Sequence, residues 1–288
     1  DAQAIEPAMA GVPATDGAGS DAPPGLEPHL LMMSATPIPR TLAMTYYADL
    51  DVSTLDELPP GRTPVLTKLF ADDKRDQVIA RIRDELAHET RGGSERQVYW
   101  VCPLIDESEH VDLQNATATH AELSAALPGT RVGLLHGRMP AAEKAAVMSL
   151  FTNGPPEARI RVLVATTVIE VGVDVPAASL MVIEHAERFG LAQLHQLRGR
   201  VGRGAAASVC VLLYTGPLSP TAKDRLRALA ETSDGFEIAR RDLEIRGPGE
   251  FMGARQSGDA LLRFADLATD TELLQKARET AAWLQREH

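Results

Sequence analysis

Short apolar segments alternate with amphipathic segments through the middle of this chain, and this alternation restricts the fold more than any other feature. The apolar segments have the length and composition of strands, and they lie at Val65–Phe70, Gln97–Pro103, Arg131–Leu135, Arg161–Ala165, Leu180–Ile183 and Ser208–Tyr214. The segments between them have helical spacing, and they lie at Lys74–Thr90, Leu113–Leu127, Ala141–Phe151 and Leu191–Arg198. Strands that alternate with helices form right-handed units whose parallel sheet carries helices on both faces. The sequence therefore predicts an α/β fold.

The segment Gln196–Arg203 reads Gln-Leu-Arg-Gly-Arg-Val-Gly-Arg and is the strongest candidate for a functional loop. Arg200 and Arg203 can reach one compact anionic target, because guanidinium groups stay charged and match phosphate oxygens bidentately. Ligands of open parallel sheets gather at the carboxyl ends of the strands, and we expect the string on a loop of that kind. Alone, the string is equally compatible with a basic surface turn.

A second candidate follows the predicted strand Arg161–Ala165. The strand is followed by two hydroxyls, Thr166 and Thr167, and then by Gly172 and Asp174. Hydroxyls at a strand end suit phosphate or sugar contacts, and a loop carboxylate can accept a ribose hydroxyl. Taken alone, this segment is better explained as an ordinary strand with a polar loop end.

Composition limits the remaining possibilities. The net charge is -11, yet residues 196–255 carry ten Lys or Arg against seven Asp or Glu, so that stretch is net positive. No apolar run approaches the roughly 20 residues of a membrane span, so we expect no membrane partner. Cys102 and Cys210 lie in apolar strand-like runs and are predicted to be buried thiols, and no metal site is expected.

Four segments occur in the order and spacing of superfamily 2 helicase motifs. They are Ser34-Ala35-Thr36-Pro37, Leu135-His136-Gly137-Arg138, Thr166–Pro176 and Gln196–Arg203. Further segments resemble the RecG family of branch-migrating DNA helicases, namely Met33–Leu42, Ala43–Pro60, Cys102–Glu109 and Arg188–Gly204. Residues Arg225–Gly258 are similar to the translocation motif that RecG shares with the transcription–repair coupling translocase. The loops Leu55–Arg62 and Val101–Glu109 favour RecG over that relative.

The resemblance implies a RecA-like parallel sheet with helices on both faces, followed by a helical hairpin and loop that form a translocation motif. Residues 1–28, rich in Ala, Pro and Gly and without Lys or Arg, are expected to be a disordered linker or insertion. The expected parts after it are a remnant of the first RecA-like domain with a connector (29–60), the second RecA-like helicase domain (61–215), the translocation motif (216–258) and a C-terminal helical tail (259–288).

The resemblance also implies a role for each matching residue. Arg200 and Arg203 would be arginine fingers that reach ATP held by another domain. Gln196 would hydrogen-bond near the γ-phosphate or to the segment Thr166–Pro176. Gly172 and Asp174 would lie by the ribose or relay the state of the nucleotide, and Ser34 and Thr36 would couple hydrolysis to strand movement. The residues expected to contact DNA are Thr166, Thr167, Arg240, Arg241, Arg246, Arg255 and Gln256.

The expected function is therefore an ATP-dependent double-strand DNA translocase that remodels replication forks and Holliday junctions, acting in the bacterial cytoplasm at the nucleoid. A P-loop needs a lysine that follows glycine, and none of the five lysines does so. The chain begins at Asp1, so we expect a fragment with negligible ATPase. Its ATP and Mg²⁺ site would be completed by an upstream first motor domain, which a wedge domain would accompany. The motor of the transcription–repair coupling translocase and a non-hydrolysing DNA-binding helicase half remain alternatives.

Overall fold

A six-stranded parallel sheet forms the centre of the fold. The computed structural model describes residues 53, 62, 64–89, 96–103, 109–166, 174–204, 207–246, 273, 276, 277, 279–281, 283 and 284. The strands are β1 (Leu66–Ala71), β2 (Gln97–Val101), β3 (Val132–Leu135), β4 (Val162–Ala165), β5 (Ala178–Ile183) and β6 (Val209–Tyr214). They are arranged in the order β1-β6-β5-β2-β4-β3, and every neighbouring pair is parallel. The predicted α/β class is confirmed.

The central strands owe their position to their apolar side chains. Every residue of β2 and β4 is buried, whereas the edge strands β1 and β3 carry partly exposed residues. Trp100 of β2 is in register with Val164 of β4 and with Val182 of β5. Such strands, apolar on both faces, must be covered on both faces by helices.

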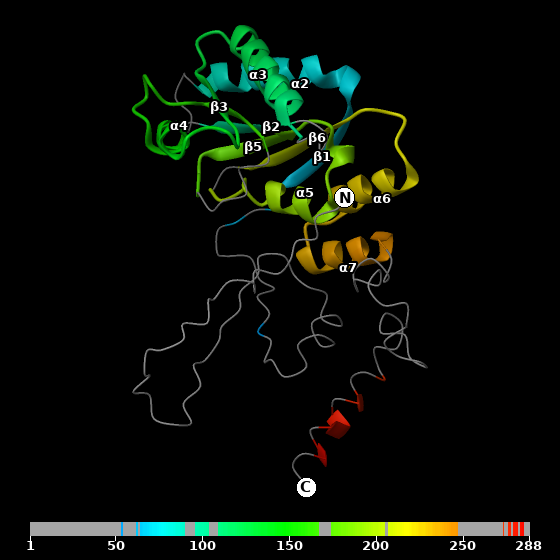
Figure 1. Cartoon of the computed structure of the whole chain (residues 1–288). Coiled ribbons are helices and arrows are strands. Elements are labelled where there is room, and N and C mark those ends of the chain that lie inside the picture. Colours follow the sequence, from blue (N-terminus) through cyan, green and yellow to red (C-terminus); the bar gives the residue numbers. More distant parts are fainter. Residues whose placement is uncertain are drawn as a thin grey trace, which may run out of the picture. The chain divides into compact units, whose positions relative to one another are not determined.

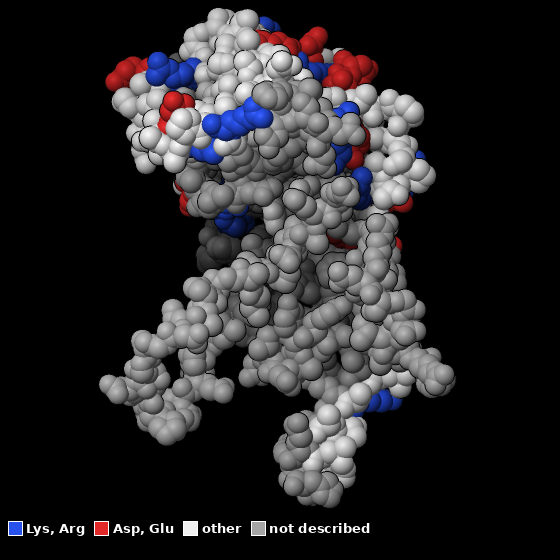
Figure 2. Space-filling model, in the orientation of Figure 1, with Lys and Arg blue, Asp and Glu red and all other residues white. Residues whose placement is uncertain are grey.

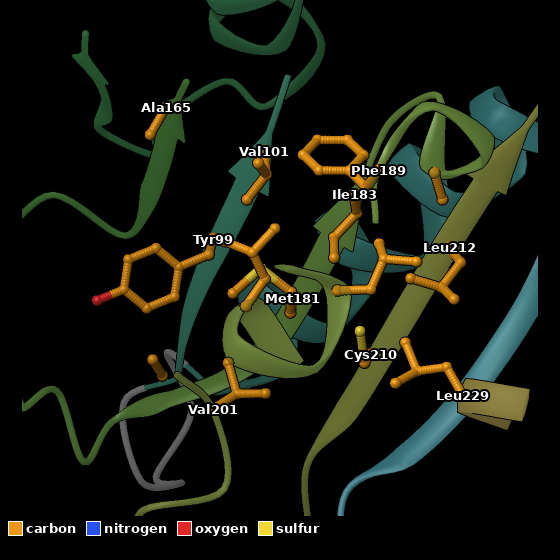
Figure 3. Close-up of a cluster of buried hydrophobic side chains, with 14 of the residues drawn as sticks. Tyr99, Val101, Ala165, Met181, Ile183, Phe189, Val201, Cys210, Leu212 and Leu229 are labelled. Carbon is orange, nitrogen blue, oxygen red and sulfur yellow. The ribbon is translucent and has the colours of Figure 1, made fainter. Parts of the chain in front are cut away.

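Alternate strand residues enter two separate cores. One core contains Val98, Trp100 and Val164 and packs against α2 (Arg75–Glu89) and α3 (Glu109–Ala126). The other contains Tyr99 and Met181 and packs against α4 (Ala141–Asn153), α5 (Leu191–Arg198) and α6 (Pro220–Glu231). Figure 1 shows α2 and α3 on one side of the sheet and α5 and α6 on the other, and Figure 3 shows part of the second core. The fold is thus a three-layer sandwich with the strand period of two dividing its cores.

Two short helices, α6 and α7 (Gly235–Arg246), form the predicted helical hairpin. The Ser219 side chain accepts a hydrogen bond from the backbone N–H of Ala222 at 3.2 Å, which caps α6. The Asp234 carboxylate accepts one from the backbone N–H of Phe236 at 2.8 Å at the start of α7. Both caps supply partners for amide groups that a helix leaves unpaired at its N-terminus.

The predicted elements agree with the structure except at their ends. Strand β2 ends at Val101, two residues before the predicted end, and β5 begins at Ala178, two residues before its predicted start. Cys102 and Cys210 are buried and unlinked, as predicted. The expected remnant of the first RecA-like domain with its connector (29–60) lies outside the described residues, except for residue 53.

Candidate functional site at the arginine loop

The arginine loop, Gly199–Gly204, lies at the amino ends of the strands, whereas the sequence predicted the carboxyl ends. A short helix, η3 (Ala186–Arg188), follows the carboxyl end of β5, and α5 then returns the chain across the sheet. Residues 199–208 therefore lead into the first residue of β6. The prediction that Arg200 and Arg203 lie at the carboxyl ends of the strands is wrong, because a loop that enters a strand must lie at its amino end.

Glycines fix the course of this loop. Gly202 has φ of +78°, in the left-handed region that glycine adopts most readily. A side chain on Gly204 would place its Cβ 2.4 Å from the Pro176 carbonyl oxygen. The glycine spacing therefore holds the arginine loop directly against the segment Asp174–Ala177, which leads into β5.

This close approach brings Arg203 to Asp174. Nη1 of Arg203 donates a hydrogen bond to Oδ1 of Asp174 at 3.3 Å, and Nε donates to the Gly199 carbonyl oxygen at 3.3 Å. The Arg203 side chain is 23% exposed and the Asp174 side chain is 63% exposed. The structure thus unites two predicted site residues that are 29 positions apart, at a surface that a ligand can reach.

Tyr99 lies beneath these charges and was missed from the sequence. Burial raises the pKa of its phenol to about 12; Arg200 and Arg203 oppose this shift, whereas Asp174 adds to it. Its ring packs edge-on against Phe151 at a centroid distance of 4.9 Å. A signal was present in the sequence, because the strand period places Tyr99 on the face that α5 covers.

Arg198, in the same string, has a structural role. Its side chain is almost fully buried, and Nη1 donates to the carbonyl oxygens of Leu229 and Thr232, both at 2.8 Å, and to Oγ1 of Thr67 at 3.4 Å. Burial lowers its pKa, because desolvation disfavours the charged form. The guanidinium joins α5 to the end of α6 and to β1. Gln196, two residues earlier, is only partly exposed on the same helix.

Thr166 lies at the carboxyl ends of the strands, opposite to the arginine loop. Its backbone N–H donates to the Leu135 carbonyl oxygen at 3.1 Å, and its buried Oγ1 has no hydrogen-bond partner among the described residues. His136 follows the neighbouring strand β3, and no described residue supplies a partner for its buried Nδ1. The predicted DNA contact and the arginine loop are therefore at opposite edges. Thr167, Gly172, Ser34 and Thr36 lie outside the described residues.

The hairpin arginines predicted to contact DNA lie within an ion-pair network. Arg240 pairs with Glu237 at 2.7 Å and also with Glu244. Arg241 pairs with Glu231 at 2.7 Å and with Glu237 at 2.8 Å. The two arginines hold the pKa of Glu237 at about 2, by hydrogen bonds first and by their charge. The Arg246 side chain, Arg255 and Gln256 lie outside the described residues.

Neither the surface in view nor a group of metal-binding side chains adds a further candidate site among the described residues. On the face drawn in Figure 2, basic and acidic side chains are interspersed over the described residues. Within the described ranges, no three His, Cys, Asp or Glu side chains are grouped to hold a metal ion. No helix among those residues is both long and apolar enough to cross a membrane.

Two family descriptions match the chain: the helicase conserved C-terminal domain at residues 77–205, and the C-terminal part of domain 3 of the ATP-dependent DNA helicase RecG at residues 232–287. The first spans the arginine loop and the second begins in the hairpin.

The chain belongs to the RecG family.

Its RecG relatives are similar along most of the chain. The RecG of Acidithiobacillus ferridurans is 62% identical over 250 residues, which cover 87% of this chain and 35% of the relative. The RecG of Escherichia coli K12 is 58% identical over 257 residues, 89% of this chain and 36% of the relative. A solved structure of RecG bound to a three-way DNA junction is 45% identical, with a TM-score of 0.64, and the match covers 84% of this chain and 30% of that one. The chain thus spans about a third of the curated RecG relatives, and the predicted RecA-like helicase fold is confirmed.

Proposed function

We propose that this chain is the C-terminal motor portion of an ATP-dependent double-strand DNA translocase that remodels replication forks and Holliday junctions. The observation that carries the proposal is the arginine loop, which presents Arg203 beside Asp174 at a ligand-accessible surface. The relatives are named ATP-dependent DNA helicase RecG, and the solved relative is bound to a three-way DNA junction. These names favour RecG over the transcription–repair coupling translocase.

ATP fits the arginine loop. Two guanidinium groups three positions apart, on a loop fixed by glycine, supply the donors that phosphate oxygens accept. ATP supplies the phosphoryl group whose transfer drives the motor. Arg200 and Arg203 would stabilise negative charge on the phosphates, Gln196 would hydrogen-bond beside them, and Gly172 and Asp174 would serve the ribose. An upstream domain would hold Mg²⁺ and the remaining phosphate contacts.

DNA would contact other parts of the chain. Thr166 and Thr167 follow β4 at the carboxyl ends of the strands, where the Thr166 hydroxyl, which has no partner among the described residues, would donate to a phosphate oxygen. Arg240 and Arg241 would exchange part of their glutamate network for phosphates, and Arg246, Arg255 and Gln256 would act with them. Ser34 and Thr36 would couple hydrolysis to strand movement. We place the protein in the bacterial cytoplasm, where such DNA is found.

The chain alone would have negligible ATPase, because no lysine follows a glycine and the sequence therefore has no P-loop. The remainder of the proposed polypeptide, a wedge domain and a first motor domain, would complete the site. A purely DNA-holding role is less consistent with the paired Arg203 and Asp174, which a site without hydrolysis would not require.

The test is to mix the chain with the upstream portion of a RecG relative and to measure ATPase with and without branched DNA. We expect DNA-stimulated ATPase from the mixture and a loss of at least about 100-fold with Arg203→Ala, since an arginine finger contributes roughly 10³-fold or more. Arg81→Ala, on an exposed arginine of α2 that pairs with Glu85, is the matched control. ATPase of the chain alone within about tenfold of the mixture, or an active Arg203→Ala mixture, would contradict the proposal.

A further inference from the structure

The Arg203–Asp174 ion pair is built so that it can form and open easily. The guanidinium is held on two sides, by the Asp174 carboxylate at 3.3 Å and by the Gly199 carbonyl oxygen at 3.3 Å. The contact between Gly204 and Pro176 fixes the two backbones that carry the pair. The carboxylate is 63% exposed, and exposed ion pairs contribute little stability. An anionic ligand can therefore displace Asp174 without disrupting the backbone.

A phosphate and the Asp174 carboxylate would compete for the same Arg203 guanidinium. A phosphate that binds Arg203 must take the place of the carboxylate, because both anions use the fork of N–H donors. The Nε–H bond to Gly199 belongs to the loop itself and can persist. Without Asp174, the guanidinium would keep its Nε–H bond to Gly199, and its Nη1 donor would be open to a phosphate without competition from a carboxylate.

We propose that Asp174 is a positioning residue that holds the Arg203 guanidinium at the amino edge of the sheet until a phosphate displaces it. The inference rests on the proposed function for the identity of the anion as a nucleotide phosphate. It assigns Asp174 a role toward Arg203 that is separate from a contact with the ribose. Asp174 competes with the phosphate for the guanidinium and keeps that guanidinium in place between nucleotides.

The test uses inorganic pyrophosphate and ATP as two probes of the chain, with binding measured by calorimetry. Because pyrophosphate has no ribose, it reports only on the arginines. Asp174→Asn should tighten pyrophosphate binding about two- to fivefold, because the competing carboxylate is removed. In an Arg203→Met background the same substitution should have no effect, because the contested guanidinium is absent. This double-mutant cycle separates local competition from a long-range effect of charge.

Two outcomes would overturn the inference. One is equal tightening by Asp174→Asn in both backgrounds, which would indicate a general charge effect. The other is unchanged pyrophosphate binding together with weaker ATP binding, which would indicate a ribose contact alone.

A second measurement tests the positioning role of Asp174 even if pyrophosphate binds too weakly for calorimetry. In the free chain, the Nη1–H resonance of Arg203 should be sharp and slow to exchange, because Nη1 donates to Asp174, and Asp174→Asn should broaden it or hasten its exchange. An unchanged resonance would refute the positioning role. Neither measurement requires hydrolysis. Absence of the expected ATPase would therefore not contradict the positioning role of Asp174, and absence of that role would not contradict the proposed ATPase.

Discussion

Replacing Arg198 by methionine removes a buried cation that joins three elements of the fold. The guanidinium donates to the carbonyl oxygens of Leu229 and Thr232 at 2.8 Å each. Leu229 belongs to the last turn of α6, where helix carbonyl groups lack partners within the helix. Methionine keeps most of the aliphatic volume and leaves both carbonyl oxygens without their donor.

The size of the effect follows from these contacts. A hydrogen bond from a charged donor contributes about 1.5–3 kcal/mol, and two of them are lost. Part of that loss is offset, because the variant no longer keeps a desolvated charge in the interior. We therefore expect the free energy of unfolding to fall by roughly 2–4 kcal/mol. For a domain of this size, that corresponds to a Tm decrease of roughly 5–15 °C.

Urea unfolding followed by circular dichroism measures the change, and hydrogen exchange locates it. Protection should fall first in α6 and α7, because their junction loses its anchor. The control is Arg81→Ala on the exposed surface of α2, which should change stability by less than about 1 kcal/mol. A loss below about 1 kcal/mol in Arg198→Met, or unchanged protection of the hairpin, would refute the assignment of Arg198 as an anchor.

Three further predictions concern the same region and the expected DNA contacts. Gly204→Ala should destabilise the chain by a few kcal/mol or displace the arginine loop, because the added Cβ meets the Pro176 carbonyl oxygen at 2.4 Å; unchanged stability together with an unmoved loop in a crystal structure would contradict this. Burial, aided by Arg198, lowers the pKa of His195 to about 4. The folded state then binds fewer protons than the unfolded state between pH 6.5 and 4, so stability is complete above pH 6.5 and falls by roughly 3 kcal/mol toward pH 4. His195→Gln should remove this part of the pH slope, and an equal slope in both proteins would disprove it. DNA binding by the chain should weaken steeply with salt and show little sequence preference, which fluorescence anisotropy with duplexes of equal length can measure.

Local sequence was sufficient to predict the sheet because its central strands are apolar on both faces. The strands β2 and β4 are fully buried, so their composition alone marks them as interior. Strand ends were less certain, since Cys102 and Pro103 are buried beyond the last residue of β2. The prediction that placed the arginine loop at the carboxyl ends of the strands is wrong. A loop that precedes a strand lies at the amino end of that strand, and this rule alone places the loop correctly.

The arginine string shows where sequence reasoning reached its limit. Arg198, Arg200 and Arg203 are chemically identical, and only their spacing distinguishes them. Helical spacing from Leu191 and Leu194 does place Arg198 on the buried face of α5, so its structural role left a signal. Nothing local indicates that Asp174 would pair with Arg203, because that contact depends on two separate loops meeting at the sheet edge.

The sequence by itself determined the parallel α/β sandwich, the helical hairpin and the family, because hydrophobic period, caps and motif order are properties of neighbouring residues. Tertiary structure alone decided that Arg203 pairs with Asp174, which lies on a separate loop. It also joined the buried Arg198 to the carbonyl oxygens of Leu229 and Thr232. These outcomes depend on how α5 crosses the sheet and on the contact between Gly204 and Pro176. The physical reason is that burial and charge pairing are set by groups that are distant along the chain and meet only when the sheet forms.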